Sequence, residues 1–175
     1  MTTTNTIRNL IVAGALAATG LSFASPVLAA PADLELIQSY VGNWRGTGTL
    51  NNAGQPGESV RCRLNITRSN AEKINFSGRC AIAGTTLSMA GTMAYISAAN
   101  RYEAIMTSNT SFKGVAIGTR RGSNVTFNLQ SVDDNGETSR VRAGFGLTGD
   151  TINVDFEVTN ADGTKIVADI PFDRN

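Results

Sequence analysis

The chain has 175 residues, no histidine and two cysteines, and its 15 basic residues nearly balance its 14 acidic ones. A chain with so little net charge has no long-range field to attract nucleic acid, so we expect no nucleic-acid partner. Without histidine, no Ser-His-Asp or Cys-His catalytic group can be assembled within the chain, and we expect a protein that is not an enzyme.

The first 30 residues have the pattern of a secretory signal peptide. A polar start with one cation, Arg8, precedes an apolar run over residues 10–23. That run is shorter than the ~20 apolar residues that a membrane span requires, and small residues near Ala30 offer a cleavage site. We predict a signal peptide over 1–30 and one exported domain over 31–175, periplasmic or secreted. The alternative is an uncleaved membrane anchor.

The domain begins with its single helical pattern, over residues 31–41. Leu34, Ile37 and Tyr40 recur at helical spacing, and Asp33 is placed to cap the helix. We expect one or two amphipathic turns that pack on one end of the domain.

From Trp44 onward the apolar residues recur at every second position, which is the period of a β-strand. About ten such strands follow one another with only short turns between them. A meander of this length must close or expose two long edges. We therefore predict an all-β fold, a single up-and-down antiparallel barrel of eight to ten strands after the short helix. Its outward face is polar, whereas a lipid-facing barrel is apolar outside, so we expect a barrel that does not span a membrane.

The segment from Val60 to Ile82 sets the first register. Folded about Ala71, it places each apolar residue opposite another, and Cys62 opposite Cys80. Facing cysteines on neighbouring strands of an exported protein can form a disulfide bond. Two buried thiols are the alternative.

Turn residues fix the remaining registers. They predict the facing pairs Cys80 with Met89, Tyr95 with Tyr102, Ala116 with Phe127, Phe127 with Ala143, Leu147 with Ile152, and Phe156 with Ala168.

The segment from Gly42 to Gly48 reads Gly-Asn-Trp-Arg-Gly-Thr-Gly and opens the first strand. It resembles the Gly-x-Trp signature of the calycin superfamily, which includes lipocalins, fatty-acid-binding proteins, avidins and nitrobindin-like barrels. The resemblance implies that Trp44 plugs the closed end of the barrel and that Arg174 packs on its ring by a cation–π contact. Nitrobindin-like proteins hold haem through a histidine, which this chain lacks, so we expect no haem by that route and no other cofactor or metal.

The layout of Trp44, Cys62 and Cys80 also resembles the small periplasmic metalloprotease inhibitors of bacteria. That resemblance implies a free N-terminal arm, here Ala30 to Leu36, that enters the cleft of a protease.

We expect any small-molecule site on the inner wall of the barrel. Methionine adapts to irregular ligands, glycine leaves room, and tyrosine hydroxyls at one rim would meet the polar end of a ligand. The sequence leaves open whether the interior is hollow or filled by large residues packed against small ones. The candidate ligand-binding residues are Met89, Gly91, Met93, Tyr95, Tyr102 and Met106.

The outer wall carries a second candidate. Arg61, Arg63 and Arg79 are predicted to lie together, where like charges would be mildly destabilising and an anionic envelope component would be attracted. A solvated basic face is the alternative. Arg142 is expected to pair with Glu157 across two strands.

The leading hypothesis is an exported barrel that binds a small hydrophobic ligand such as a lipid; the alternatives are a protease inhibitor and an envelope structural or stress protein.

Overall fold

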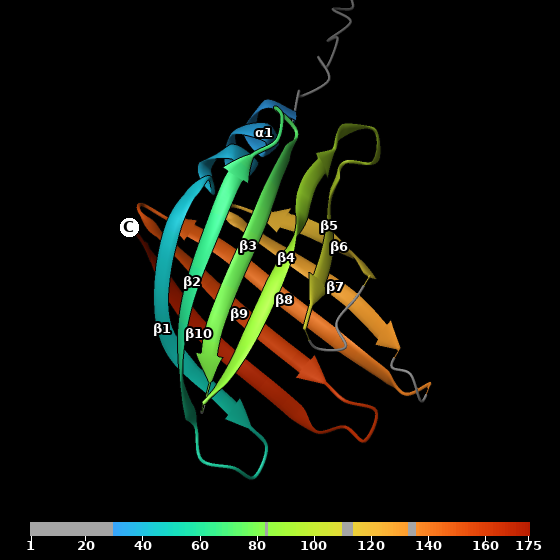
Figure 1. Cartoon of the computed structure of the whole chain (residues 1–175). Helices are drawn as coiled ribbons and strands as arrows, with labels where there is room; N and C mark the ends of the chain where they lie inside the picture. Colours follow the sequence, from blue (N-terminus) through green and yellow to red (C-terminus); the bar gives the residue numbers. More distant parts are fainter. Residues whose placement is uncertain (1–29, 83, 110–113, 133–135) are drawn as a thin grey trace, which may run out of the picture.

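A computed structural model describes residues 30–82, 84–109, 114–132 and 136–175. The signal peptide predicted over 1–30 lies outside these ranges except for its last residue. Within them, ten strands form one closed antiparallel barrel in which each strand pairs with its neighbour in sequence and the last strand returns to the first (Figure 1). The elements are α1 (Ala30–Ser39), β1 (Gly42–Asn52), β2 (Glu58–Arg68), β3 (Lys73–Ile82), β4 (Thr85–Ile96), β5 (Arg101–Ser108), β6 (Gly114–Arg121), β7 (Asn124–Val132), β8 (Thr138–Thr148), β9 (Thr151–Thr159) and β10 (Lys165–Arg174), with one 3-10 turn, η1 (Ser97–Ala99).

The prediction of an all-β, up-and-down barrel is confirmed. Alternate side chains of the strands converge on one interior core, to which Met93 and Phe127 both belong. Each strand buries one face in this core and is hydrogen-bonded to a strand on either side, so the closed sheet has no open edge. Among the described residues, no helix is long and apolar enough to cross a membrane.

Helix α1 covers one end of the barrel (Figure 1). Leu36 and Ile37 are buried in the barrel core, as an amphipathic helix requires. The helix begins at Ala30 and ends at Ser39, slightly earlier than the predicted range of 31–41. Asp33 is therefore not the N-cap but lies in the first turn. The segment from Ala30 to Leu36 is also not a free arm, because it is helical and its inner side packs on the barrel.

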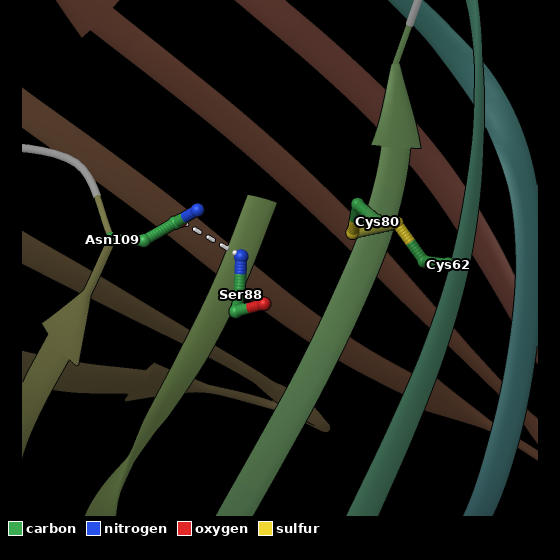
Figure 2. The surroundings of a disulfide bond; sticks show 4 residues. All are labelled: Cys62, Cys80, Ser88 and Asn109. Atoms are coloured by element: carbon green, nitrogen blue, oxygen red, sulfur yellow. Dashed lines mark hydrogen bonds between the residues drawn. A yellow bond between two sulfur atoms is a disulfide. The ribbon is translucent and has the colours of Figure 1, made fainter. Parts of the chain in front are cut away.

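Most predicted registers are confirmed. Cys62 pairs with Cys80, and the sulfur atoms of the two residues form a disulfide bond between β2 and β3 (Figure 2). The structure also confirms the pairs Tyr95 with Tyr102, Phe127 with Ala143, Leu147 with Ile152, and Phe156 with Ala168.

Two predicted registers are wrong by two residues. Met89 lies opposite Gly78 rather than Cys80, because Ile82 pairs directly with Thr85. Phe127 lies opposite Gly118 rather than Ala116, because the β6–β7 turn is formed by residues 122–123. A shift of two residues returns every side chain to the same face, so the hydrophobic pattern cannot distinguish the alternatives. The position of a left-handed glycine decides between them, as Gly122 does here with φ of 62°.

Candidate functional site

The barrel encloses a cavity of about 210 Å³ whose lining is almost entirely apolar. It extends from Tyr40, beside α1, to residues near the opposite strand ends such as Leu50 and Ile82. The interior is therefore hollow in part, which answers the question that the sequence left open. An apolar cavity of this size holds water poorly, because a water molecule inside would lack hydrogen-bond partners.

Three of the six predicted ligand-binding residues line this cavity. They are Met89, Met93 and Met106, on the neighbouring strands β4 and β5. Gly91 lies between them in the sheet but is not part of the lining. A Cβ atom there would clash with the backbone carbonyl of Ile105 and lie 2.6 Å from Cζ of Phe76, so this glycine admits the close approach of β5 and of a phenyl ring rather than a ligand.

Tyr95 and Tyr102 do not line the cavity. Their rings lie 5.1 Å apart, and both side chains are buried at the end that α1 covers. The prediction placed them at a rim where their hydroxyls would meet a ligand. Both hydroxyls instead donate hydrogen bonds within the protein. Tyr95 donates to Asn100 Oδ1 at 2.7 Å, and Tyr102 donates to Asp33 Oδ1 at 2.8 Å.

Two small residues that make room for the cavity lie on the predicted inner face but were not among the candidate ligand-binding residues. Gly78, on β3, lines it directly opposite Met89. Ala104 lines it between Met93 on β4 and Ala116 on β6. The alternation of the strands put these positions on the inner face, but their grouping depends on the corrected β3–β4 register and on the closure of the barrel.

The closed end is built around Trp44, which is 1% exposed. Its indole Nε1 donates a hydrogen bond to the carbonyl of Tyr40 at 2.9 Å, and the guanidinium carbon of Arg174 lies 4.2 Å from the ring centroid. Arg174 also donates to the carbonyls of Val41 at 2.8 Å and Ser39 at 3.3 Å. One cation thus covers the tryptophan and satisfies carbonyl groups at the C-terminal end of α1.

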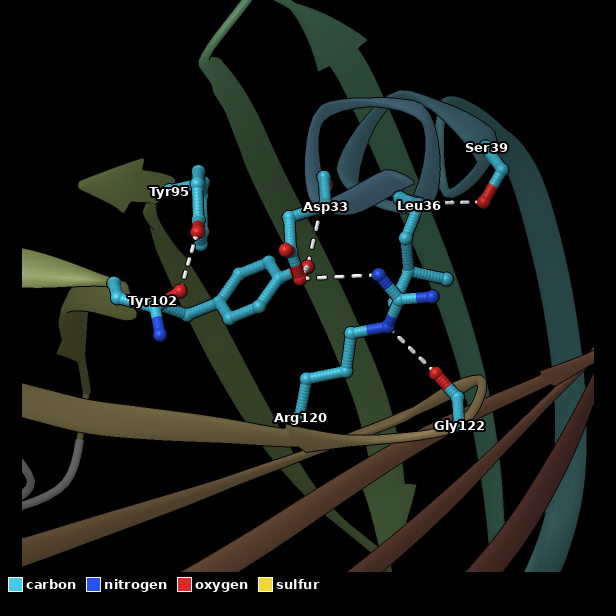
Figure 3. A network of polar contacts seen from close by, with 8 residues as sticks. Asp33, Leu36, Ser39, Tyr95, Tyr102, Arg120 and Gly122 are labelled. Carbon is cyan, nitrogen blue, oxygen red and sulfur yellow. Dashed lines mark hydrogen bonds and ion pairs between the residues drawn. The ribbon is translucent and has the colours of Figure 1, made fainter. Parts of the chain in front are cut away.

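A buried polar network ties the first turn of α1 to the barrel (Figure 3). Asp33 is a buried residue, 7% exposed. Its carboxylate accepts a hydrogen bond from the Tyr102 hydroxyl on β5 and another from Arg120 Nη1 on β6, the second at 3.1 Å. Arg120 Nε donates to the carbonyl of Gly122 at 2.6 Å. The carboxylate is thus paired with a cation and hydrogen-bonded, which a buried charge requires. The network anchors α1 over the barrel end.

Burial sets the ionisation of the tyrosines in this end. It raises the pKa of Tyr40 well above its ordinary value of 10.0, although the charge of Arg120 opposes the shift. Burial, and then the hydrogen bond and charge of Asp33, raise the pKa of Tyr102 even further. Both side chains therefore remain neutral in the folded protein at pH values where tyrosines of an unfolded chain ionise.

Alkaline pH is expected to destabilise the fold. A group whose pKa is higher in the folded state stabilises the protein fully below its unfolded pKa, and that stabilisation is lost as the pH rises above it. Between pH 9 and pH 11, Tyr40 and Tyr102 should each lower the free energy of unfolding by about 1.4 kcal/mol. Urea unfolding at a series of pH values measures this loss. Tyr102→Phe should reduce the loss over this pH range by about 1.4 kcal/mol, and an unchanged pH dependence in that variant would contradict the assignment.

The predicted pair of Arg142 and Glu157 is correct in register but not as an ion pair. The two residues face each other on β8 and β9. Arg142 Nη1 lies 3.3 Å from Asp155 Oδ2, whereas Glu157 Oε1 lies 2.8 Å from Lys165 Nζ on β10. The register of two strands limits which charged residues a long side chain can reach, but it does not select one ion-pair partner, because diagonal neighbours are also within reach.

Neither a protein-family model nor a curated protein matches the sequence. Solved structures do resemble the fold. The S-type phycobiliprotein lyase CPES from Guillardia theta aligns with a TM-score of 0.59 at 14% identity, over 81% of this chain and 91% of the lyase. The Rv2717c protein from M. tuberculosis aligns with a TM-score of 0.62 at 9% identity, over 82% of this chain and 97% of that one. At such low identities the likeness concerns the fold alone, and this chain shares the barrel architecture of those two proteins.

Proposed function

We propose that the protein binds a small apolar molecule inside the barrel. The observation that carries the proposal is the apolar cavity of about 210 Å³, which Tyr40 borders at the end covered by α1. Three methionines line it, and their flexible, polarizable side chains adapt to ligands of irregular shape. Binding would be driven by removal of apolar ligand surface from water rather than by specific hydrogen bonds.

The size of the cavity limits the ligand. Sites for drug-sized molecules usually occupy about 300–1,000 Å³, whereas an apolar cavity of about 150 Å³ accepts benzene. A cavity of about 210 Å³ therefore suits one or two rings or a short alkyl chain. A long-chain lipid would fit only with its remainder outside the cavity.

We further propose that the protein acts in the cell envelope or outside the cell, without catalysis, as a barrel of the calycin type. The disulfide between Cys62 and Cys80 supports export, because such bonds persist in oxidising compartments. The absence of histidine from the chain supports a binding role rather than acid–base or nucleophilic chemistry. The Gly-x-Trp segment and the contact of Arg174 with Trp44 support the calycin relationship. The protease-inhibitor alternative is weaker, because its proposed arm is packed as helix α1.

A cavity-filling variant tests the binding proposal. Ala104→Leu adds three carbon atoms at a lining position, and we expect it to weaken binding of a neutral two-ring fluorescent probe, 1-naphthylamine, at least about tenfold. The matched control is Ala81→Leu, because Ala81 is exposed on the outer face of β3 and does not line the cavity. Fluorescence titration of the purified protein and of both variants gives the affinities, and thermal unfolding shows that each variant is folded.

The outcomes are distinct. Probe binding that Ala104→Leu weakens and Ala81→Leu does not would support a site inside the barrel. Equal weakening by both substitutions, or no binding to the unsubstituted protein by the probe or by short-chain alcohols, would reject it.

A further inference from the structure

A second hollow, of about 660 Å³, lies on the outer face of strands β1 to β5. Its lining is mixed, with arginine, hydroxyl and amide side chains beside apolar residues. Its volume lies within the range typical of small-molecule sites. The outward-facing residues along it include Asn43, Arg45, Arg63, Asn65, Arg79 and Ser88.

Three of these residues form a row across adjacent strands, which we call the arginine row: Arg45 on β1, Arg63 on β2 and Arg79 on β3. Arg45 pairs in register with Arg63, and Arg63 pairs in register with Arg79. Neighbouring strands lie about 5 Å apart, so the bases of the three side chains span roughly 10 Å. The sequence grouped Arg61 with Arg63 and Arg79. The facing of Arg63 and Arg79 is confirmed, and Arg61 lies beside Arg63 on the outer face of β2. Arg61 faces Thr47 and Ala81 in register and does not line the hollow.

The arginine row makes no ion pair in the described part of the chain, although Asp173 on β10 faces Arg45 in register. None of its three guanidinium groups makes a hydrogen bond or an ion pair with another described residue. Four other arginines of the barrel make ion pairs, as Arg174 does with Asp150 at 3.0 Å. Among the described residues, Arg61, Arg68, Arg121 and Arg140 also make none. The carboxylate nearest in register is that of Asp173, opposite Arg45, and its Oδ1 accepts a hydrogen bond from Thr151 at 2.9 Å.

Like charges at facing positions of a ladder destabilise a sheet. A row of three such charges in a hollow is therefore an arrangement that an anion would stabilise. From this juxtaposition we propose that the outer hollow binds a small molecule with at least two phosphate groups, either linked as a diphosphate or on separate atoms. This site lies on the outer side of the wall that encloses the apolar cavity. Five residues of that wall border both hollows: Arg63, Leu64, Gly78, Met89 and Ser108.

The chemistry of the wall favours phosphate over a carboxylate. The guanidinium fork matches the oxygen atoms of a phosphate group and binds them with two parallel hydrogen bonds. Three cationic groups exceed the charge of a single phosphate, so two phosphates about one strand spacing apart would neutralise the arginine row best. Neutral donors lie alongside: the Asn65 amide already donates to Asn43 Oδ1 at 2.6 Å, which leaves the amide nitrogen of Asn43 available to an anion.

Titration of the purified protein with pyrophosphate at low salt tests the proposal. We expect binding that is tighter than that of orthophosphate and that weakens as salt is added. Arg63→Ala removes the central group of the arginine row and should reduce the affinity for pyrophosphate about tenfold or more. Arg61→Ala is the matched control, because it removes an equal charge from the same strand outside the hollow, and it should change the affinity less than about threefold.

Further measurements distinguish the outcomes. Arg63→Ala should be at least as stable as the unsubstituted protein without ligand, since it relieves repulsion within the row. Ala104→Leu, which fills the apolar cavity, should leave pyrophosphate binding unchanged, so that failure of one site is separable from failure of the other. No pyrophosphate binding, or an equal loss in Arg61→Ala and Arg63→Ala, would overturn the proposal. Binding only to phosphatidylglycerol vesicles would also overturn it, because that result indicates a membrane-facing surface instead.

Discussion

Replacing Trp44 with alanine should lower the free energy of unfolding by about 3–5 kcal/mol, the cost typical of removing a large buried aromatic side chain. Trp44 is among the largest side chains of the core and is 1% exposed. Its removal would open a cavity at the barrel end and leave the carbonyl of Tyr40 without its indole donor. It would also remove the ring on which Arg174 lies. Urea unfolding of the variant measures the loss.

Two further variants separate the contributions of Trp44. Trp44→Phe keeps most of the apolar volume but loses the indole N–H, so we expect a smaller cost of about 1–3 kcal/mol. Arg174→Ala combined with Trp44→Ala in a double-mutant cycle should show a coupling energy of about 0.5–2 kcal/mol, because the two side chains are in contact. A cycle with no coupling would mean that Arg174 acts only on the helix carbonyls. Equal costs for Trp44→Phe and Trp44→Ala would mean that the ring volume contributes little.

Removing the disulfide should cost about 3 kcal/mol. The two cysteines are 18 residues apart, and closing a loop of that size lowers the entropy of the unfolded chain by an amount worth about 3 kcal/mol in the chain-entropy model. The double variant Cys62→Ala with Cys80→Ala measures this effect without leaving a free thiol. Because the bond constrains the unfolded chain, the denaturant dependence of unfolding should become steeper in the variant.

Chemical reduction provides the control for this experiment. The reduced, alkylated protein and the double alanine variant should lose similar stability if the bond itself, rather than the packing of the two buried sulfur atoms, is responsible. If reduction left the unfolding midpoint unchanged, the disulfide would have no part in holding the fold.

The fold was accessible from the sequence because its signals are local. Strand periodicity requires only that successive side chains point to opposite faces, and turn residues mark where each strand ends. The segment from Val60 to Ile82 is the clearest example, since hydrophobic pattern and cysteine spacing select the same register. Without a cysteine pair, pattern and turn residues gave a register wrong by two residues at the β3–β4 and β6–β7 turns. They gave the correct register at the β4–β5, β7–β8, β8–β9 and β9–β10 turns.

The candidate sites depend on contacts that no local pattern contains. Alternation placed Met89, Gly78 and Ala104 on the inner face, but only the three-dimensional packing shows that a cavity remains between them. It likewise placed Tyr102 inside without showing that its hydroxyl meets Asp33, 69 residues earlier in the chain. Arg45 joined the arginine row only through the β1–β2 pairing.

The sequence by itself determined the strand order, the closed sheet and the disulfide, because the period of a strand and the chemistry of a turn act over a few neighbouring residues. Tertiary structure alone decided which inward side chains fill the interior and which leave it hollow, and which charged side chains find partners. Those outcomes depend on volumes and distances between residues far apart in the chain, which exist only once the barrel has closed.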